Sequence, residues 1–180
     1  MGKSKLPALV ATAVAVPVAV FAGIAVFDLI APSADDSRFD EDLSPVSVAV
    51  PQLSGDDAVV CLALTATAPE SAAGLPARPV EGGEHASEFV LAYGDPAVVV
   101  TCGVESVEVA PTAPIYLMNG VCWYTEEDGD GTEWVTVDRR VPVGVTVPAE
   151  HEQPADVLNG LSPTIADKVP ATGEAPANCS

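Results

Sequence analysis

Basic side chains are scarce in this chain. Its 180 residues include 7 lysines and arginines against 26 aspartates and glutamates, which gives a formal net charge of −19 at pH 7. A phosphate backbone is bound by surfaces rich in Lys and Arg, so the composition predicts no nucleic-acid partner. For the same reason the chain is poorly suited to docking on anionic lipid headgroups.

Catalytic signatures are also missing. The sequence contains no G-x-S-x-G, no H-E-x-x-H and no phosphate-binding glycine loop. A hydrolytic triad needs a histidine as its base, and the two histidines, His85 and His151, stand in acidic loops. We therefore expect a protein that is not an enzyme and that carries no cofactor. The alternative is an envelope hydrolase in which one of these histidines meets a Ser or a Cys.

Aromatic residues make up only 5% of the chain, and Val and Ala supply most of its apolar content. The longest run without a charged residue that is rich in these two residues extends from Leu6 to Phe27. As a helix it would span about 33 Å, which matches a bilayer core of roughly 30 Å. Lys3 and Lys5 precede this run, and several acidic residues follow it. The positive-inside rule then predicts a single-pass membrane protein with its N-terminus in the cytoplasm and the rest of the chain outside.

Two prolines, Pro7 and Pro17, would kink such a helix, although membrane helices tolerate proline better than soluble helices do. The alternative is a cleaved signal peptide, which would leave a secreted protein; its apolar region is usually about 7–15 residues long. The predicted organisation is a cytoplasmic stub at 1–5, a transmembrane signal-anchor at 6–31, an acidic linker at 32–45, an extracytoplasmic domain at 46–170 and a tail at 171–180.

The predicted extracytoplasmic domain mixes strand and helix patterns. A helix is expected from Ser54, with Asp57 completing a capping box, up to Pro69. A second helix is expected from Pro154, interrupted near Pro163. The strands are expected at 46–50, 88–94, 97–104, 115–128 with a hairpin turn at Asn119-Gly120, and 133–148. These elements predict an α+β fold, in which a small antiparallel sheet carries an N-terminal and a C-terminal helix and is preceded by one transmembrane helix.

The stretch from 133 to 148 has the clearest periodicity. Its valines occupy odd positions and would share one face of a single extended strand. They are Val135, Val137, Val141, Val143, Val145 and Val147. Arg139 falls on the same face. Either a bulge near Pro142 returns Arg139 to solvent, or its buried charge pairs with a carboxylate such as Asp95 or Asp138.

Four cysteines fall in the part of the chain that is predicted to lie outside the cytoplasm. They are Cys61, Cys102, Cys122 and Cys179. Disulfides form and persist in oxidising compartments, and no pair has the C-x-x-C spacing of a zinc or redox motif. The sequence thus predicts two structural disulfides and no metal site, with three pairings open.

Several segments follow one another in a particular order. They are a helix with Cys61, "AYGDPAVVVTCGV" at 92–104, "MNGVCWY" at 118–124, an arginine-containing strand that ends in "VTVP", and a helix with "LS". This order resembles the actinobacterial domain of unknown function 3515 over about residues 45 to 170. The resemblance implies a short membrane-anchored or secreted protein. The family has no assigned activity, so the resemblance implies no active site.

The chain departs from that family pattern at several positions. Cys122 stands where the family commonly has an acidic residue, and Cys179 lies in a tail beyond the pattern. The resemblance therefore implies that these two extra cysteines pair with each other, which leaves Cys61 with Cys102. Tyr93 and Ala97 stand where the family usually has Trp and Pro.

An acidic hairpin at 125–134 is a weak candidate for a Ca²⁺ site. Its possible ligands are Asp128, Asp130 and Glu133, with Glu126 and Glu127 beside them. Clustered carboxylates suit a hard cation, but the twelve-residue loop of a calcium-binding hand is not present. A solvated turn is favoured, because such Gly-containing turns form without metal.

Arg139 and Arg140 suggest a small-ligand or anion site, since arginine binds carboxylates through two parallel hydrogen bonds. A pocket lined by Arg139, Asp95 and Tyr93 would favour this function. In the alternative, Arg139 forms an internal ion pair and Arg140 extends to the surface. The leading hypothesis is a membrane-anchored, non-enzymatic interaction or accessory module of the cell envelope, whose partner is an unidentified envelope protein.

Overall fold

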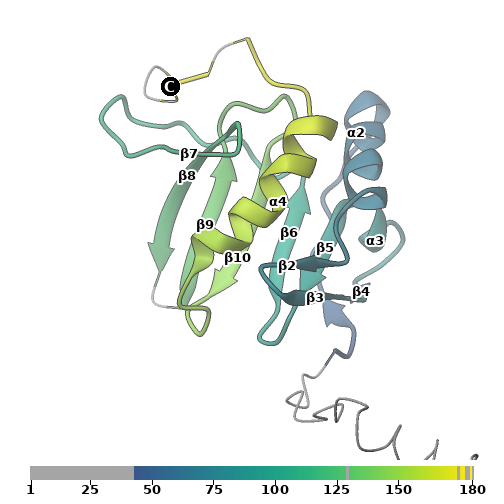
Figure 1. The fold of residues 1–180 in the computed structure, drawn as a ribbon. Coiled ribbons are helices and arrows are strands. Elements are labelled where there is room, and N and C mark those ends of the chain that lie inside the picture. Colours follow the sequence, from purple (N-terminus) through teal and green to yellow (C-terminus); the bar gives the residue numbers. More distant parts are fainter. Residues whose placement is uncertain (1–42, 129, 174, 177–178, 180) are drawn as a thin grey trace, which may run out of the picture. The chain divides into compact units, whose positions relative to one another are not determined.

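The computed structural model describes residues 43–128, 130–173, 175–176 and 179 (Figure 1). The chain divides into two compact units, Met1–Asp40 and Glu41–Ser180, and the described residues belong to the second. The predicted transmembrane segment at 6–31 and most of the linker at 32–45 lie outside them. Within the described residues, no helix has the length and apolar character needed to cross a membrane.

The framework is an eight-stranded sheet in which every neighbouring pair is antiparallel. The strand order is β2-β3-β5-β6-β10-β9-β8-β7. The strands are β2 (Ser71–Ala72), β3 (Leu75–Arg78), β5 (Val90–Tyr93), β6 (Val98–Cys102), β7 (Tyr116–Met118), β8 (Val121–Asp128), β9 (Gly131–Thr136) and β10 (Val143–Pro148). A separate parallel pair joins β1 (Val46–Ser47) to β4 (Val80–Glu81).

Within the described residues, three helices accompany the sheet: α2 (Gly55–Ala66), α3 (Ala86–Phe89) and α4 (Pro154–Lys168). In Figure 1, α4 lies across the front of the sheet, and α2, which contacts α4, lies at its side. The predicted α+β class with an antiparallel sheet is confirmed. The eight-stranded sheet is larger than predicted, because β2 and β3 extend one margin and the segment at 133–148 supplies two strands.

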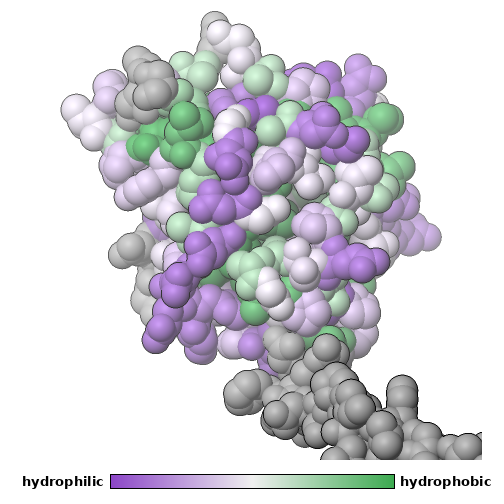
Figure 2. All heavy atoms as spheres, viewed as in Figure 1, coloured by the Kyte–Doolittle hydropathy of each residue, from purple (hydrophilic) through white to green (hydrophobic). Residues whose placement is uncertain are grey.

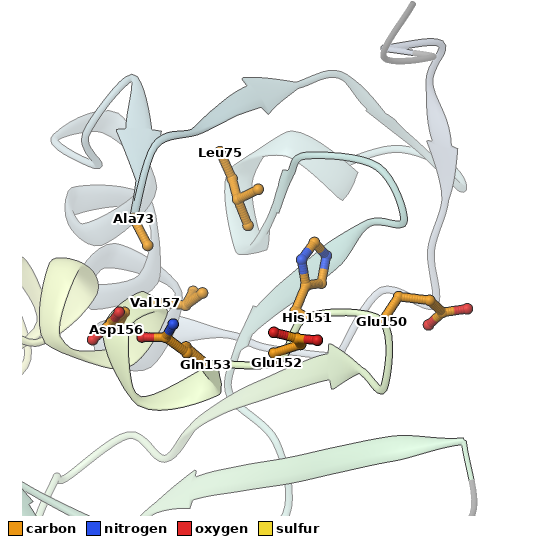
Figure 3. Close-up of a pocket in the computed structure, with 8 residues that line it drawn as sticks. All are labelled: Ala73, Leu75, Glu150, His151, Glu152, Gln153, Asp156 and Val157. Atoms are coloured by element: carbon orange, nitrogen blue, oxygen red, sulfur yellow. The ribbon is translucent and has the colours of Figure 1, made fainter. Parts of the chain in front are cut away.

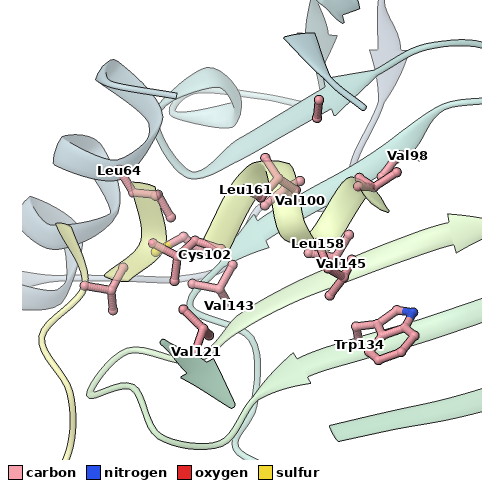
Figure 4. Close-up of a cluster of buried hydrophobic side chains, with 14 of the residues drawn as sticks. Leu64, Val98, Val100, Cys102, Val121, Trp134, Val143, Val145, Leu158 and Leu161 are labelled. Carbon is pink, nitrogen blue, oxygen red and sulfur yellow. The ribbon is translucent and has the colours of Figure 1, made fainter. Parts of the chain in front are cut away.

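The core fills the space between the helices and one face of the sheet (Figure 4). Along β6, buried residues alternate with partly exposed ones, so Val98, Val100 and Cys102 face the core. On β10 the inward residues are Val143, Val145 and Val147. Such alternation is typical of an antiparallel sheet with one covered face.

The segment at 133–148 is not one strand, and this prediction is wrong. It forms β9 and β10, which pair antiparallel with Trp134 opposite Val145. The inward face on β9 is therefore the even one, with Trp134 and Thr136 buried. The odd-numbered valine pattern continues across the connection between β9 and β10. On β9, however, the even-numbered Trp134 faces the core, because its large side chain gains most from burial.

The start of α2 also differs from its prediction. Ser54 occupies the N-cap position, but its side chain makes no capping hydrogen bond. Gly55 follows with a φ of +60°, which is outside the helical region. Without a hydrogen bond from the first turn to the Ser54 side chain, the predicted capping box with Asp57 is not formed.

Helix α4 continues through Pro163 instead of breaking there. A proline inside a helix leaves the carbonyl four residues earlier without its usual donor. Here that carbonyl belongs to Asn159, and it accepts a hydrogen bond from Asn119 Nδ2 at 3.0 Å. The hairpin turn between β7 and β8 thus supplies the donor that the helix lacks.

Candidate functional site

All four cysteines are paired in disulfides. Cys61 on α2 is bonded to Cys102 on β6, with 5.5 Å between their Cα atoms. Cys122 on β8 is bonded to Cys179 in the tail, with a Cα separation of 5.8 Å. These are the pairs that the family resemblance implies. The first bond joins a helix to a central strand inside the core, and neither bond leaves a thiol for catalysis.

Asp138 lies next to the second disulfide. Its carboxylate and the sulfurs of Cys122 and Cys179 all lie within 4.8 Å of one another. A zinc site would need free thiolates. Because the two sulfurs are bonded to each other and the carboxylate is bound by Arg139, this group is not a metal site in the oxidised protein.

Arg139 is buried in the connection between β9 and β10 and forms an ion pair with its neighbour Asp138. Its Nε and Nη2 atoms donate to the two carboxylate oxygens at 3.1 Å each. Nη1 donates to the Val169 carbonyl at 3.2 Å, and Nη2 also donates to the Gly120 carbonyl. The guanidinium therefore fastens the β9–β10 connection to the end of α4 and to the β7–β8 turn.

Arg140 has a different environment. Its side chain is 44% exposed, and its Nη2 lies 3.7 Å from Oδ1 of Asp57, which is also exposed. An ion pair between two exposed side chains stabilises a protein little. Arg140 thus keeps most of its hydrogen-bonding capacity for another partner.

The other predicted members of the anion site lie elsewhere. Asp95 is in the β5–β6 turn and pairs with Arg78, whose Nη1 is 3.5 Å from its Oδ1. The Arg139 connection meets the opposite end of β6, where Cys102 pairs with Val143. The length of β6 separates the two ends by roughly 13 Å at about 3.3 Å per residue. The structure therefore does not bring Asp95 together with Arg139.

Tyr93 is buried on β5, and its hydroxyl donates to the Pro69 carbonyl at 3.0 Å. Burial raises the pKa of Tyr93 to about 12. The phenol is therefore neutral at physiological pH, and it anchors the segment that follows α2. It takes no part in a common pocket with Arg139.

A cavity of about 450 Å³ lies beside the two arginines. The loop after β6, the β9–β10 connection and the segment after α4 lie at the same end of the sheet (Figure 1). Residues from these three segments line the cavity. Its lining consists of Val104, Ser106, Val107, Thr136, Val137, Arg139, Arg140, Pro142 and Thr172. Of the predicted ligand residues, only Arg139 and its neighbour Arg140 belong to it.

No sequence pattern predicts several of these lining residues. Thr172 lies in a stretch predicted to be a tail, where small polar residues show no periodicity. The segment is placed by backbone pairing: the Thr172 amide donates to the Asp138 carbonyl at 2.8 Å, and the Arg140 amide donates to the Pro170 carbonyl at 2.8 Å. The sequence also does not predict the role of Arg78, whose buried guanidinium donates hydrogen bonds to the Ser44 and Gly94 carbonyls.

His151 lies in a second pocket, of about 400 Å³, that acidic residues surround (Figure 3). Its Nε2 is 2.7 Å from the Pro96 carbonyl oxygen and must donate a proton to it. Within the described residues, no Ser or Cys lines this pocket. His85 Nδ1 instead lies 2.9 Å from a carboxylate oxygen of Glu88.

The acidic hairpin is the β8–β9 turn, in which Asp128 pairs with Gly131 and Glu126 pairs with Glu133. Tyr124 donates to Glu126 at 3.0 Å, and this hydrogen bond raises the pKa of the tyrosine. The side chain of Asp128 is not among those described. The weak calcium site stays a prediction.

The fold and its two cross-links define a disulfide-stabilised α+β domain. A sequence model described as "Protein of unknown function (DUF3515)" matches residues 13–173. The chain belongs to this family, and the resemblance found in the sequence is confirmed. No curated protein and no solved structure matches the chain.

Proposed function

We propose that this protein is a membrane-anchored, extracytoplasmic, non-enzymatic interaction or accessory module of the cell envelope. The observation that carries this proposal is that every cysteine is in a disulfide. Disulfides persist in oxidising compartments, which supports a place outside the cytoplasm. The uncharged run from Leu6 to Phe27, preceded by lysines, supplies the anchor.

A non-catalytic role is supported by the two histidines. His85 faces Glu88, and His151 donates its Nε2 proton to a main-chain carbonyl. Neither arrangement is the pairing of a base with a nucleophile that hydrolysis requires.

An interaction role is supported by apolar side chains on the surface. The outer strand β7 exposes Tyr116 to 44% and Leu117 to 55%, and apolar spheres gather over this strand in Figure 2. On α2, Val59 and Leu62 are exposed as well. Grouped exposed apolar residues are typical of surfaces that contact other molecules.

Protease treatment of intact spheroplasts tests the location. We expect the domain to be degraded while a cytoplasmic marker survives, and we expect the untreated protein to stay in the membrane pellet after an alkaline carbonate wash. Protection of the domain until lysis would contradict an extracytoplasmic location. Release of the untreated chain by the wash would contradict the anchor and favour signal cleavage.

Chemical cross-linking of the intact chain in its own membrane tests the accessory role. The expected result is a discrete adduct with an envelope protein, identified by mass spectrometry. If no adduct forms and deletion leaves the envelope unchanged, the accessory role is wrong.

A second candidate function is small-ligand or anion binding, and the cavity beside Arg139 and Arg140 is the observation that favours it. Cavities of such size are common ligand sites. Titration of the full chain with inorganic phosphate and with carboxylates, followed by NMR, tests this function. It fails if no anion at millimolar concentration shifts the resonances of residues 104–107 and 137–142.

A further inference from the structure

The two arginines of the cavity have unequal capacities for a ligand. Arg139 already donates to both oxygens of Asp138 and to two carbonyls, and its charge is balanced by that buried carboxylate. Removing it from Asp138 would leave an unpaired buried charge, which is very costly. Arg139 therefore shapes the cavity and does not bind its ligand.

Arg140 is the available guanidinium. Its ion pair with Asp57 is long, at 3.7 Å, and both side chains are about half exposed. Water weakens such a pair, so a carboxylate that offers two oxygens to the guanidinium would replace Asp57 at little cost. A charged anchor for an anion thus lies at the wall of the cavity.

The remaining lining divides into apolar and hydroxyl-bearing side chains. Val104, Val107, Val137 and Pro142 supply an apolar wall. Among the hydroxyls, Thr136 accepts a hydrogen bond from the Val143 amide at 2.9 Å. Thr172 Oγ1 is buried and has no hydrogen-bond partner within the described residues. Because its oxygen has almost no accessible surface, this hydroxyl is not counted as a ligand contact.

The charge of the whole chain restricts the kind of ligand. The full chain has a formal net charge of −19 at pH 7, and its negative charge repels anions, so a small inorganic anion held by one guanidinium would bind weakly. A ligand that also buries an apolar group against the valines gains a favourable contribution that does not depend on charge. The cavity volume of about 450 Å³ is typical of sites that bind small molecules.

We propose that this cavity binds a small monocarboxylate that carries an aliphatic substituent, with the carboxylate on Arg140 and the substituent against Val104, Val107 and Val137. The inference rests on the second candidate function, ligand binding at this cavity. A free short-chain carboxylic acid and the C-terminal residue of a peptide share this chemistry.

The test is a titration of the full chain in nanodiscs, followed through the ¹³C-labelled methyl groups of its valines. The probes are 4-methylpentanoate, its neutral analogue 4-methylpentanamide, acetate and inorganic phosphate. We expect 4-methylpentanoate to shift the methyl signals of the three cavity valines in a saturable way. The amide and acetate should each bind at least about tenfold more weakly, because each lacks one half of the recognised group.

Matched variants identify the anchor. R140Q should lower the affinity for 4-methylpentanoate about tenfold or more, whereas K168Q, which removes a cation outside the cavity, should leave it unchanged. D57N should raise the affinity several-fold, because it removes the competing carboxylate. A merely structural role of Arg140 would not produce this increase.

Different results would contradict the ligand class, the second candidate function and the role of Arg140. If phosphate binds and 4-methylpentanoate does not, the cavity is an anion site and the proposed ligand class is wrong. If no probe binds, both the ligand class and the second candidate function are wrong. Equal binding of the amide, or unchanged binding by R140Q, overturns the role of Arg140. Acetyl-Ala-Leu with a free C-terminus separates the two sources: tighter binding than that of 4-methylpentanoate supports a peptide end, and weaker binding supports a free carboxylic acid.

Discussion

Consecutive residues of opposite charge, Asp138 and Arg139, organise one end of the sheet. Both are buried, and the guanidinium binds the carboxylate through two 3.1 Å hydrogen bonds while it also reaches the Val169 carbonyl. A buried pair contributes little net stability, but loss of one partner leaves the other charge uncompensated. The pair therefore makes the geometry of this end sensitive to single substitutions.

Replacement of Arg139 tests this sensitivity. R139M should lower the free energy of unfolding by about 3–5 kcal/mol, because Asp138 would remain buried without a partner. The measurement is urea unfolding followed by tryptophan fluorescence. R140M is the matched control and should cost no more than about 1 kcal/mol.

The double variant D138N/R139M should recover part of the loss, since it leaves no unpaired charge in the interior. Equal stabilities of R139M and R140M would contradict a structural role for the Asp138–Arg139 pair.

Tyr93 makes stability depend on pH in the alkaline range. Burial raises its pKa from 10.0 to about 12, so the folded state keeps the phenol proton at pH values where the unfolded chain loses it. The stabilising contribution is complete below pH 10 and is lost as the pH rises toward 12. The free energy of unfolding should fall by up to about 1.4 kcal/mol per pH unit in that window.

The variant Y93F has no proton to lose at this site and should show a shallower decline between pH 10 and 12. It should also cost about 1 kcal/mol at neutral pH, because it loses the hydrogen bond to the Pro69 carbonyl. Y116F, on the exposed strand β7, serves as the control. If the wild type and Y93F decline in parallel, the account of Tyr93 is wrong.

Among the elements, α4 depends on the β7–β8 turn. Asn119 donates to the Asn159 carbonyl, which Pro163 leaves without a helical donor. Asn119 and Gly120 also have φ angles of 46° and 80°, as a type I′ hairpin turn requires. One residue thus forms the hairpin and completes the helix.

The variant N119G separates these two roles, because glycine keeps the positive φ and removes the side-chain donor. We expect a loss of about 1 kcal/mol in the free energy of unfolding. In a P163A background the helix regains its own amide donor, so the same substitution should cost less. Equal costs in the two backgrounds, measured by a double-mutant cycle, would contradict the coupling between Asn119 and Pro163.

Local patterns were sufficient for several elements. The Asn119-Gly120 hairpin follows from a turn that needs positive φ at both residues, and Pro154 at the start of α4 follows from its fixed φ. The predicted break at Pro163 is wrong because the donor that compensates for it, Asn119, lies 40 residues before the Asn159 carbonyl in the chain. The prediction of one strand at 133–148 is wrong because regularly spaced valines do not show where the chain turns.

The candidate site was less predictable than the fold. Arg139 is predictable as a structural residue, because it is the one polar residue among the odd-numbered valines and Asp138 is one of its two predicted partners. The cavity itself depends on Thr172, which backbone pairing with Asp138 brings to the β9–β10 connection. No pattern in a short stretch of small residues encodes such a distant contact.

At the scale of the whole molecule, two disulfides close long loops. The bonds join residues that are 41 and 57 positions apart. By restricting the unfolded chain, each should contribute about 4 kcal/mol. The double substitution C122A/C179A should therefore lower the free energy of unfolding by roughly this amount, as measured by denaturant unfolding. A loss below about 1 kcal/mol would show that the tail linkage does little for the fold.

Thiol trapping in living cells shows whether this protein carries two disulfides in a compartment outside the cytoplasm, as we propose. Cells are quenched with acid, and the chain is treated with a maleimide that carries a large polymer, with or without prior reduction. The account predicts no modified cysteine without reduction and four after it. A chain without residues 1–31, retained in the cytoplasm, controls for oxidation during lysis and should react without reduction. Modification of the full chain without reduction would contradict the account.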